Sequence, residues 1–93
     1  MRKYEFTAVF NVDEDVYKPA LESVHSIFTD FNVKIISEDH MADRTLAYPI
    51  DKKEKGRYVL YKLEVNPSVV AELKRRLALV KGLLTSLFVK LDD

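Results

Sequence analysis

Positive and aromatic side chains gather in one short stretch, and their chemistry suits contact with nucleic acid. Four cations occur within six residues, and tyrosines stand on either side at Tyr48 and Tyr58. The cations are Lys52, Lys53, Lys55 and Arg57. Ammonium and guanidinium groups donate charge-assisted hydrogen bonds to phosphate oxygens, and tyrosine rings stack on bases. The stretch therefore favours RNA contact over catalysis, although a lone cluster of this kind is more often a solvated turn beside an edge strand.

Reactive side chains do not converge elsewhere in the sequence. The serines lie in no nucleophile-elbow motif, and the two histidines have no obvious partner. His25 borders an apolar helical stripe, which predicts a surface or boundary position. His40 has Glu38, Asp39 and Asp43 nearby, a pattern more typical of a solvated edge than of a metal site. We expect no catalytic residue, no metal and no cofactor.

Length and composition predict one domain over residues 1–93. The chain is 47% apolar, with fifteen basic residues balanced by fifteen acidic ones. Electrostatic attraction to RNA must therefore come from local patches. Cysteine is absent, and no apolar run approaches the roughly 20 residues that span a bilayer. These features predict a soluble cytoplasmic domain that does not bind membranes.

Apolar periodicity predicts six elements in the order β-α-β-β-α-β. They are a strand at 3–10, a helix beginning shortly before Pro19, extended chain at 33–50 with an irregularity at 40–43, a strand at 58–65, a helix from Asn66 and Pro67, and a strand at 83–91. Two right-handed βαβ units side by side give the ferredoxin-like α+β fold, a four-stranded antiparallel sheet with both helices on one face.

Several single positions follow from this arrangement. Pro49 lacks an N–H, which predicts an edge strand, and Gly82 is expected to end the second helix. Val9 and Tyr58 are predicted on the open face of the sheet, and Tyr61 on the core face. Residues 55–62 begin like the motif by which related sheets stack RNA bases, but the stacking positions hold no aromatic residues. We therefore expect RNA contact at one border of the sheet, from the hairpin cations together with Arg2, Lys3 and Arg44.

Three short motifs resemble the family of the sixth protein of the bacterial small ribosomal subunit. They are Arg2-Lys3-Tyr4-Glu5, Arg44-x-Leu46-Ala47-Tyr48-Pro49-Ile50-x-Lys52 and Gly56-x-Tyr58. The resemblance extends along the whole chain and includes Lys90. It implies a non-enzymatic ribosomal protein that binds the central domain of small-subunit ribosomal RNA, in a heterodimer with ribosomal protein eighteen.

The resemblance also implies roles for individual residues. Phosphate contacts fall to Arg2, Arg44 and Lys52, together with Lys53, Lys55 and Lys90; Tyr48 and Pro49 fix the hairpin, and exposed residues of 33–50 contact the partner. Two positions depart from the family pattern: Ala42 replaces a common glycine, and Thr85 replaces a common arginine. A ferredoxin-like protein-interaction or small-ligand regulatory domain and a small enzyme of this fold remain the alternatives.

Overall fold

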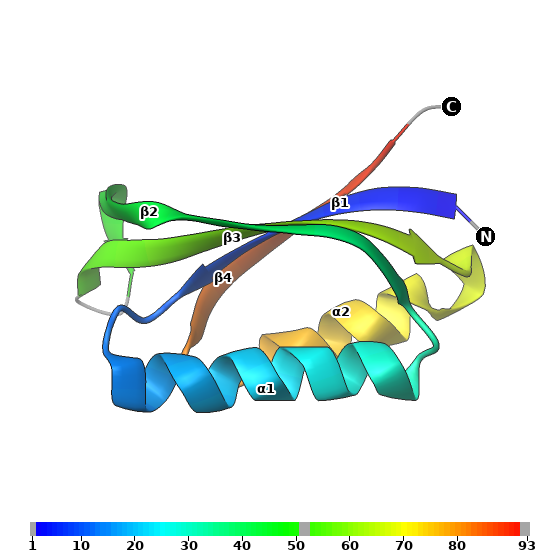
Figure 1. Ribbon diagram of the computed structural model, residues 1–93, viewed down its shortest axis with the longest axis horizontal. Helices are drawn as coiled ribbons and strands as arrows, with labels where there is room; N and C mark the ends of the chain where they lie inside the picture. Colours follow the sequence, from blue (N-terminus) through cyan, green and yellow to red (C-terminus); the bar gives the residue numbers. More distant parts are fainter. Residues whose placement is uncertain (1, 51–52, 92–93) are drawn as a thin grey trace.

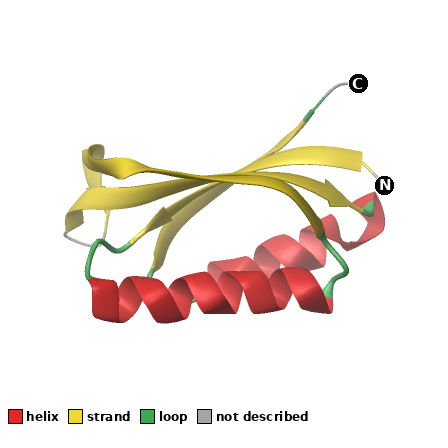
Figure 2. Ribbon diagram, viewed as in Figure 1, coloured by secondary structure: helices red, strands yellow, loops and turns green. Residues whose placement is uncertain are grey.

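The computed structural model describes the backbone of residues 2–50 and 53–91, and the side chains of those residues outside 42–50 and 53–54. The strands are β1 (Arg2–Phe10), β2 (Lys34–Ile50), β3 (Lys53–Val65) and β4 (Leu83–Lys90). They form one antiparallel sheet in the order β2-β3-β1-β4, which places β2 at an edge as Pro49 predicted. Helices α1 (Glu14–Asp30) and α2 (Val70–Ala78) cover one face and leave the other open (Figure 1, Figure 2). The predicted ferredoxin-like arrangement is confirmed.

Helix α1 begins and ends where its sequence supplies caps. The Asp13 carboxylate accepts the backbone N–H of Asp15 at 3.0 Å, which satisfies one N-terminal donor and places negative charge at the positive end of the helix dipole. Asn32 ends the helix in the left-handed region, with φ of 55°. Its geometry lets the backbone N–H of Val33 reach the carbonyl oxygen of Phe28 at 2.9 Å. Pro19 lies inside the helix, as its sixth residue.

The second helix differs from the prediction at both ends. Asn66 caps a short 3-10 turn (Pro67–Val69), with its side chain accepting the N–H of Ser68 at 3.0 Å, and α2 proper begins only at Val70. The helix ends at Ala78, so Gly82 does not end it as predicted. Gly82 instead lies in the turn before β4 with φ of +95°, a conformation that glycine adopts without a Cβ clash.

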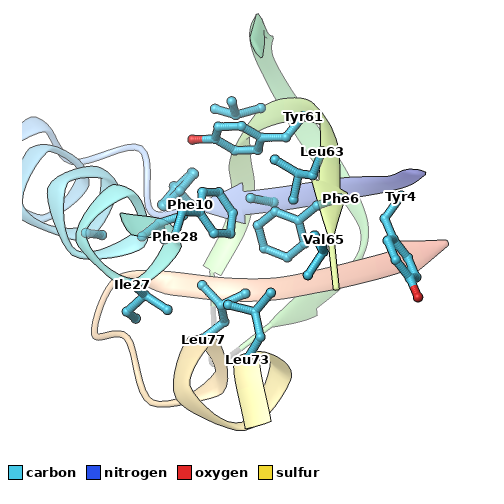
Figure 3. Close-up of a cluster of buried hydrophobic side chains, with 14 of the residues drawn as sticks. Tyr4, Phe6, Phe10, Ile27, Phe28, Tyr61, Leu63, Val65, Leu73 and Leu77 are labelled. Carbon is cyan, nitrogen blue, oxygen red and sulfur yellow. The ribbon is translucent and has the colours of Figure 1, made fainter. Parts of the chain in front are cut away.

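The core is an apolar layer between the sheet and the helices (Figure 3). Its largest fully buried side chains include Phe6 of β1, Phe28 of α1 and Tyr61 of β3. The Phe6 and Phe28 rings meet edge to face, with centroids 5.7 Å apart, a favoured geometry for aromatic pairs. Leu73 and Leu77 close the layer from α2. The predicted core position of Tyr61 is confirmed.

Two expectations about the strands are wrong. Val9 was predicted to be exposed but is 4% exposed, because Tyr58 and Thr85 flank it across the two neighbouring strands. The lysine-rich segment was predicted to be a turn before a strand at 58–65, but β3 already begins at Lys53. Backbone pairing with β2 continues there, with Thr45 opposite Lys55, and such a ladder needs no particular side chain.

Candidate RNA interface

One group of predicted site residues lies where β1 begins and β4 ends. Arg2 pairs with Val65 of β3, and Lys90 pairs with Tyr4. The backbone N–H of Leu91 donates to the carbonyl oxygen of Lys3 at 3.0 Å, which ties the two strand ends together. The side chains of Arg2, Lys3 and Lys90 are all exposed. Three cations therefore share one end of the sheet and are open to solvent.

Lys34, which was not among the predicted site residues, also lies at this basic end. It begins β2 opposite Glu64, and Glu64 lies opposite Lys3 on β1. The exposed Lys34 side chain therefore shares a sheet row and face with Lys3. The pairing of β2 with β3 brings Lys34 near Lys3, and no local sequence motif indicates this proximity.

The hairpin supplies the second group, at the opposite end of the sheet. Arg44 pairs with Gly56, Ile50 pairs with Lys53, and Lys55 has an exposed side chain. The side chains of Arg44, Tyr48 and Lys53, and the whole of Lys52, lie outside the described residues. The described backbone thus places three of the predicted cations (Arg44, Lys53 and Lys55) around the β2–β3 hairpin.

The two groups do not share one border, so that part of the prediction is wrong. Arg2 starts β1 and Arg57 pairs with Phe10 at its end. At about 3.3 Å per residue, these positions are separated by roughly 26 Å. Figure 1 shows the hairpin above the start of α1 and the N-terminus at the far end of the sheet. The prediction failed because it treated both ends of a strand as one rim.

Arg57 is the predicted cation with the most contacts among the described side chains. Its guanidinium donates to Glu14 of α1 at 2.5 Å and lies 4.4 Å from the centroid of the Tyr17 ring. It also lies 3.5 Å from the carbonyl oxygen of Val12. The side chain is 20% exposed. These contacts join β3 to the start of α1, so the Arg57 guanidinium is already engaged in an ion pair within the protein.

A line of polar side chains, which we call the polar seam, joins α1 to β2 and β3. It consists of Tyr17, His25, Glu38, His40 and Tyr61. The two carboxylate oxygens of Glu38 lie 2.9 Å from His25 Nε2 and 2.5 Å from His40 Nε2. Tyr17 Oη lies 3.1 Å from His40 Nδ1, and Tyr61 Oη lies 3.2 Å from His25 Nε2.

The polar seam corrects the expectation that the histidines have no obvious partner. His25 is a boundary residue as predicted, with its side chain 40% exposed, but it shares a carboxylate with His40. Glu38 and His40 are two residues apart, which places both on one face of β2. This spacing was the sequence signal that His40 has Glu38 as a neighbour. Their partner helix was not deducible from spacing. Burial, reinforced by the charges of Glu38 and Tyr17, raises the pKa of Tyr61 far above its ordinary value, so its hydroxyl stays protonated.

Within the described parts of the chain, no cluster of three or more His, Asp and Glu side chains is arranged to hold a metal ion. No helix in those parts is long and apolar enough to cross a membrane.

The exposed cations at the two ends of the sheet define a ferredoxin-like domain with basic ends. This geometry is suited to binding an extended anion.

Comparison with known proteins defines the family. The model of the family described as ribosomal protein S6 matches residues 3–90. The chain therefore belongs to the ribosomal protein S6 family, which is a structural family of the cytoplasmic small ribosomal subunit and is not enzymatic. The resemblance inferred from the three motifs is confirmed.

Individual relatives agree along the full length. Small ribosomal subunit protein bS6 of Treponema denticola is 52% identical over 93 residues, covering all of both chains. The protein of the same name from Treponema pallidum is 40% identical with the same coverage. Among solved structures, ribosomal protein S6 of Thermotoga maritima gives a TM-score of 0.84 at 20% identity, over 97% of this chain and 87% of the other.

The fold also occurs in a protein of another name. The C-terminal domain of the MgtC protein from Mycobacterium tuberculosis gives a TM-score of 0.63 at 10% identity, with 97% of this chain and 87% of that chain covered. At such identity the likeness concerns the fold alone. The architecture therefore does not decide function, and the family match does.

Proposed function

We propose that this chain binds the central domain of small-subunit ribosomal RNA, with residues 1–93 acting as one domain and ribosomal protein eighteen as its heterodimer partner. The observation that supports this most is the family match from residue 3 to residue 90. The exposed cations at the two ends of the sheet supply the matching chemistry. Their targets are phosphate oxygens, so RNA shape and not base sequence would be recognised.

The separation of the two basic ends constrains the complex. Ends roughly 26 Å apart along a strand cannot bind the same phosphate group. We propose that Arg2, Lys3 and Lys90 contact one segment of the RNA backbone, and that the hairpin cations Arg44 and Lys55 contact another, with Lys52 and Lys53 and the ring of Tyr48. Arg57 has a smaller part, because its guanidinium already holds Glu14.

The partner contact is proposed on β2. Three large apolar side chains of this edge strand are exposed, Ile35 at 36%, Ile36 at 46% and Met41 at 36%. An edge strand also presents backbone hydrogen-bonding groups on its outer side. Exposed apolar side chains on an unpaired edge suit a protein partner better than a phosphate backbone. Ribosomal protein eighteen is the proposed occupant.

The test is reconstitution with a central-domain RNA fragment and ribosomal protein eighteen. Replacing Arg2, Lys3 and Lys90 by glutamine is expected to weaken RNA binding and to make its salt dependence shallower, because fewer counterions are released. Glutamine at Lys18, Lys74 and Lys81 removes the same charge from the helical side and is the matched control. Equal weakening by both sets would contradict the proposed placement.

The same preparation distinguishes the regulatory-domain alternative. A domain that dimerises through β2 would sediment as a self-associated species, with or without RNA. The proposed ribosomal role predicts that sedimentation changes when the RNA fragment and the partner are added together.

A further inference from the structure

The edge strand β2 is attached to the helices differently from the rest of the sheet. Strands β1 and β3 and both helices supply the buried hydrophobic cluster, and none of the described β2 side chains, at 34–41, belongs to it. Glu38 and His40 lie opposite Tyr61 and Val59 of β3, on the face that meets α1. The side-chain contacts between β2 and α1 include the hydrogen bonds of the polar seam, from Tyr17 to His40 and from His25 to Glu38.

Hydrogen bonding in the polar seam is directional and fixes the tautomers of both rings. Glu38 accepts from Nε2 of His25 and from Nε2 of His40. With its hydrogen on Nε2, His40 accepts the Tyr17 hydroxyl at Nδ1. Tyr17 is itself held, since the Arg57 guanidinium lies over its ring and pairs with Glu14. An apolar contact has no such directional requirement and would allow β2 to slide over α1.

The polar seam is located between two irregularities of β2. Register with β3 shifts between Ile35 and Ser37 and again between His40 and Asp43. Regular pairing from Ser37 to His40 thus separates two bulged segments, and Glu38 and His40 lie within it. Bulges re-aim neighbouring side chains. The exposed Ile36 and Met41 lie in the bulged segments on either side.

From this arrangement we infer that Glu38, with His25 and His40, is a positioning group for partner binding. It fixes residues 37–40 on α1, and thereby sets where the flanking bulges present Ile36 and Met41 to ribosomal protein eighteen. The inference rests on the proposed function for the identity of the partner. It assigns a role to polar residues other than those proposed to contact RNA or the partner.

The first experiment compares variants in binding to purified ribosomal protein eighteen. Glu38→Ala removes the shared acceptor, so β2 samples other positions and the binding-competent fraction falls; affinity is expected to drop about three- to tenfold. Glu38→Gln should stay within about twofold of the wild type, because the amide oxygen accepts from one imidazole, and the amide N–H donates to the other once that ring carries its hydrogen on Nδ1.

Two controls separate positioning from general stability. Glu72→Ala removes an ion pair of similar length, 2.7 Å to Arg75, that lies within α2 and touches no strand of the seam. Leu77→Val loosens the buried core without touching β2. Both controls should bind the partner like the wild type. Equal affinity of Glu38→Ala and the wild type would overturn the inference.

The second experiment needs no partner. NMR relaxation dispersion on the free protein should detect exchange at residues 34–41 in Glu38→Ala, and not there in the wild type or in Leu77→Val. A flat profile at 34–41 in Glu38→Ala would overturn the positioning role. Failure of the wild type to bind ribosomal protein eighteen would instead contradict the proposed partner, and the dispersion profile would still decide the role of the seam.

Discussion

The two sides of the helix–sheet contact are built from different chemistry. Beneath β1 and β3 the side chains are apolar, and the rings of Phe6, Phe28 and Tyr61 contact one another, mostly edge to face, with centroids 5.5 to 5.8 Å apart. Beneath β2, Glu38 and His40 form hydrogen bonds with His25 and Tyr17 of α1. Burial of apolar area is strong and non-directional, whereas hydrogen bonds are weaker and directional. The first region therefore stabilises the fold, and the second fixes the position of one edge.

The largest effect is expected in the apolar region. Phe6 is 0% exposed and contacts the rings of Phe28, Tyr61 and Phe88. Phe6→Ala should lower the free energy of unfolding by about 3–5 kcal/mol, because it leaves a cavity at the centre of the core. Urea unfolding measures this. A loss under about 1 kcal/mol would break the comparison, since the apolar region would then not dominate stability.

Gly82 tests how closely the apolar region is packed near β4. A Cβ added there would lie 2.8 Å from Val16 Cγ1 and 3.0 Å from Ala20 Cβ, and φ is +95°. Gly82→Ala should therefore cost about 1–3 kcal/mol through strain and overlap with α1. Thermal unfolding measures the change. An unchanged midpoint would show that α1 can move away, and that this packing is looser than the geometry implies.

Tyr61 belongs to both regions, since its ring lies in the core and its hydroxyl lies in the polar seam. Tyr61→Phe keeps the ring and should cost only about 0.5–1.5 kcal/mol at neutral pH. Comparing this loss with that of Phe6→Ala separates the two chemistries. A loss as large as that of Phe6→Ala would mean that the seam contributes as much stability as the core.

The raised pKa of Tyr61 adds a pH dependence to the same comparison. Above about pH 10 the unfolded tyrosine ionises while the native one keeps its proton, so the unfolded state binds fewer protons. Stability is then lost as pH rises, by up to about 1.4 kcal/mol per unit, and the contribution is fully present below that pH. Urea unfolding between pH 9 and 11 should show a shallower decline in Tyr61→Phe. Identical slopes would contradict the buried, protonated hydroxyl.

Substitution of the hairpin lysines should matter least for stability, because Lys55 is exposed and lysine is rarely buried. Replacing Lys52, Lys53 and Lys55 by glutamine is expected to change the free energy of unfolding by less than about 0.5 kcal/mol. The same variant should weaken assembly with RNA, because three counterion-releasing charges are lost. A large loss of stability with normal assembly would reverse the assignment of the hairpin.

Sequence sufficed for the parts of the fold set by local pattern. The strand predicted at 3–10 is one such part: Tyr4, Phe6, Ala8 and Phe10 alternate along it, share one face and are all buried. The cap at Asp13 is equally local, because this carboxylate directly precedes the helix whose N–H it accepts. Each of these signals lies within a few residues of the feature that it determines.

The features that sequence missed depend on distant parts of the chain. His25 meets Glu38 only because α1 packs under β2, and Lys34 approaches Lys3 only through two strand pairings. Arg57 was predicted as an RNA ligand from its neighbours in sequence, but its contacts with Glu14 and Tyr17 are 40 or more residues away. The family was recognisable because its motifs are contiguous, whereas the spatial arrangement of its cations was not.

Salt dependence of RNA binding tests the central proposal most directly. With the seven proposed cations on phosphate, the affinity of the complex containing ribosomal protein eighteen should fall with salt at a log–log slope of about −6 beyond that of the partner alone. The slope should become shallower when either basic end is neutralised. A slope equal to that of the partner alone would contradict RNA binding by this chain.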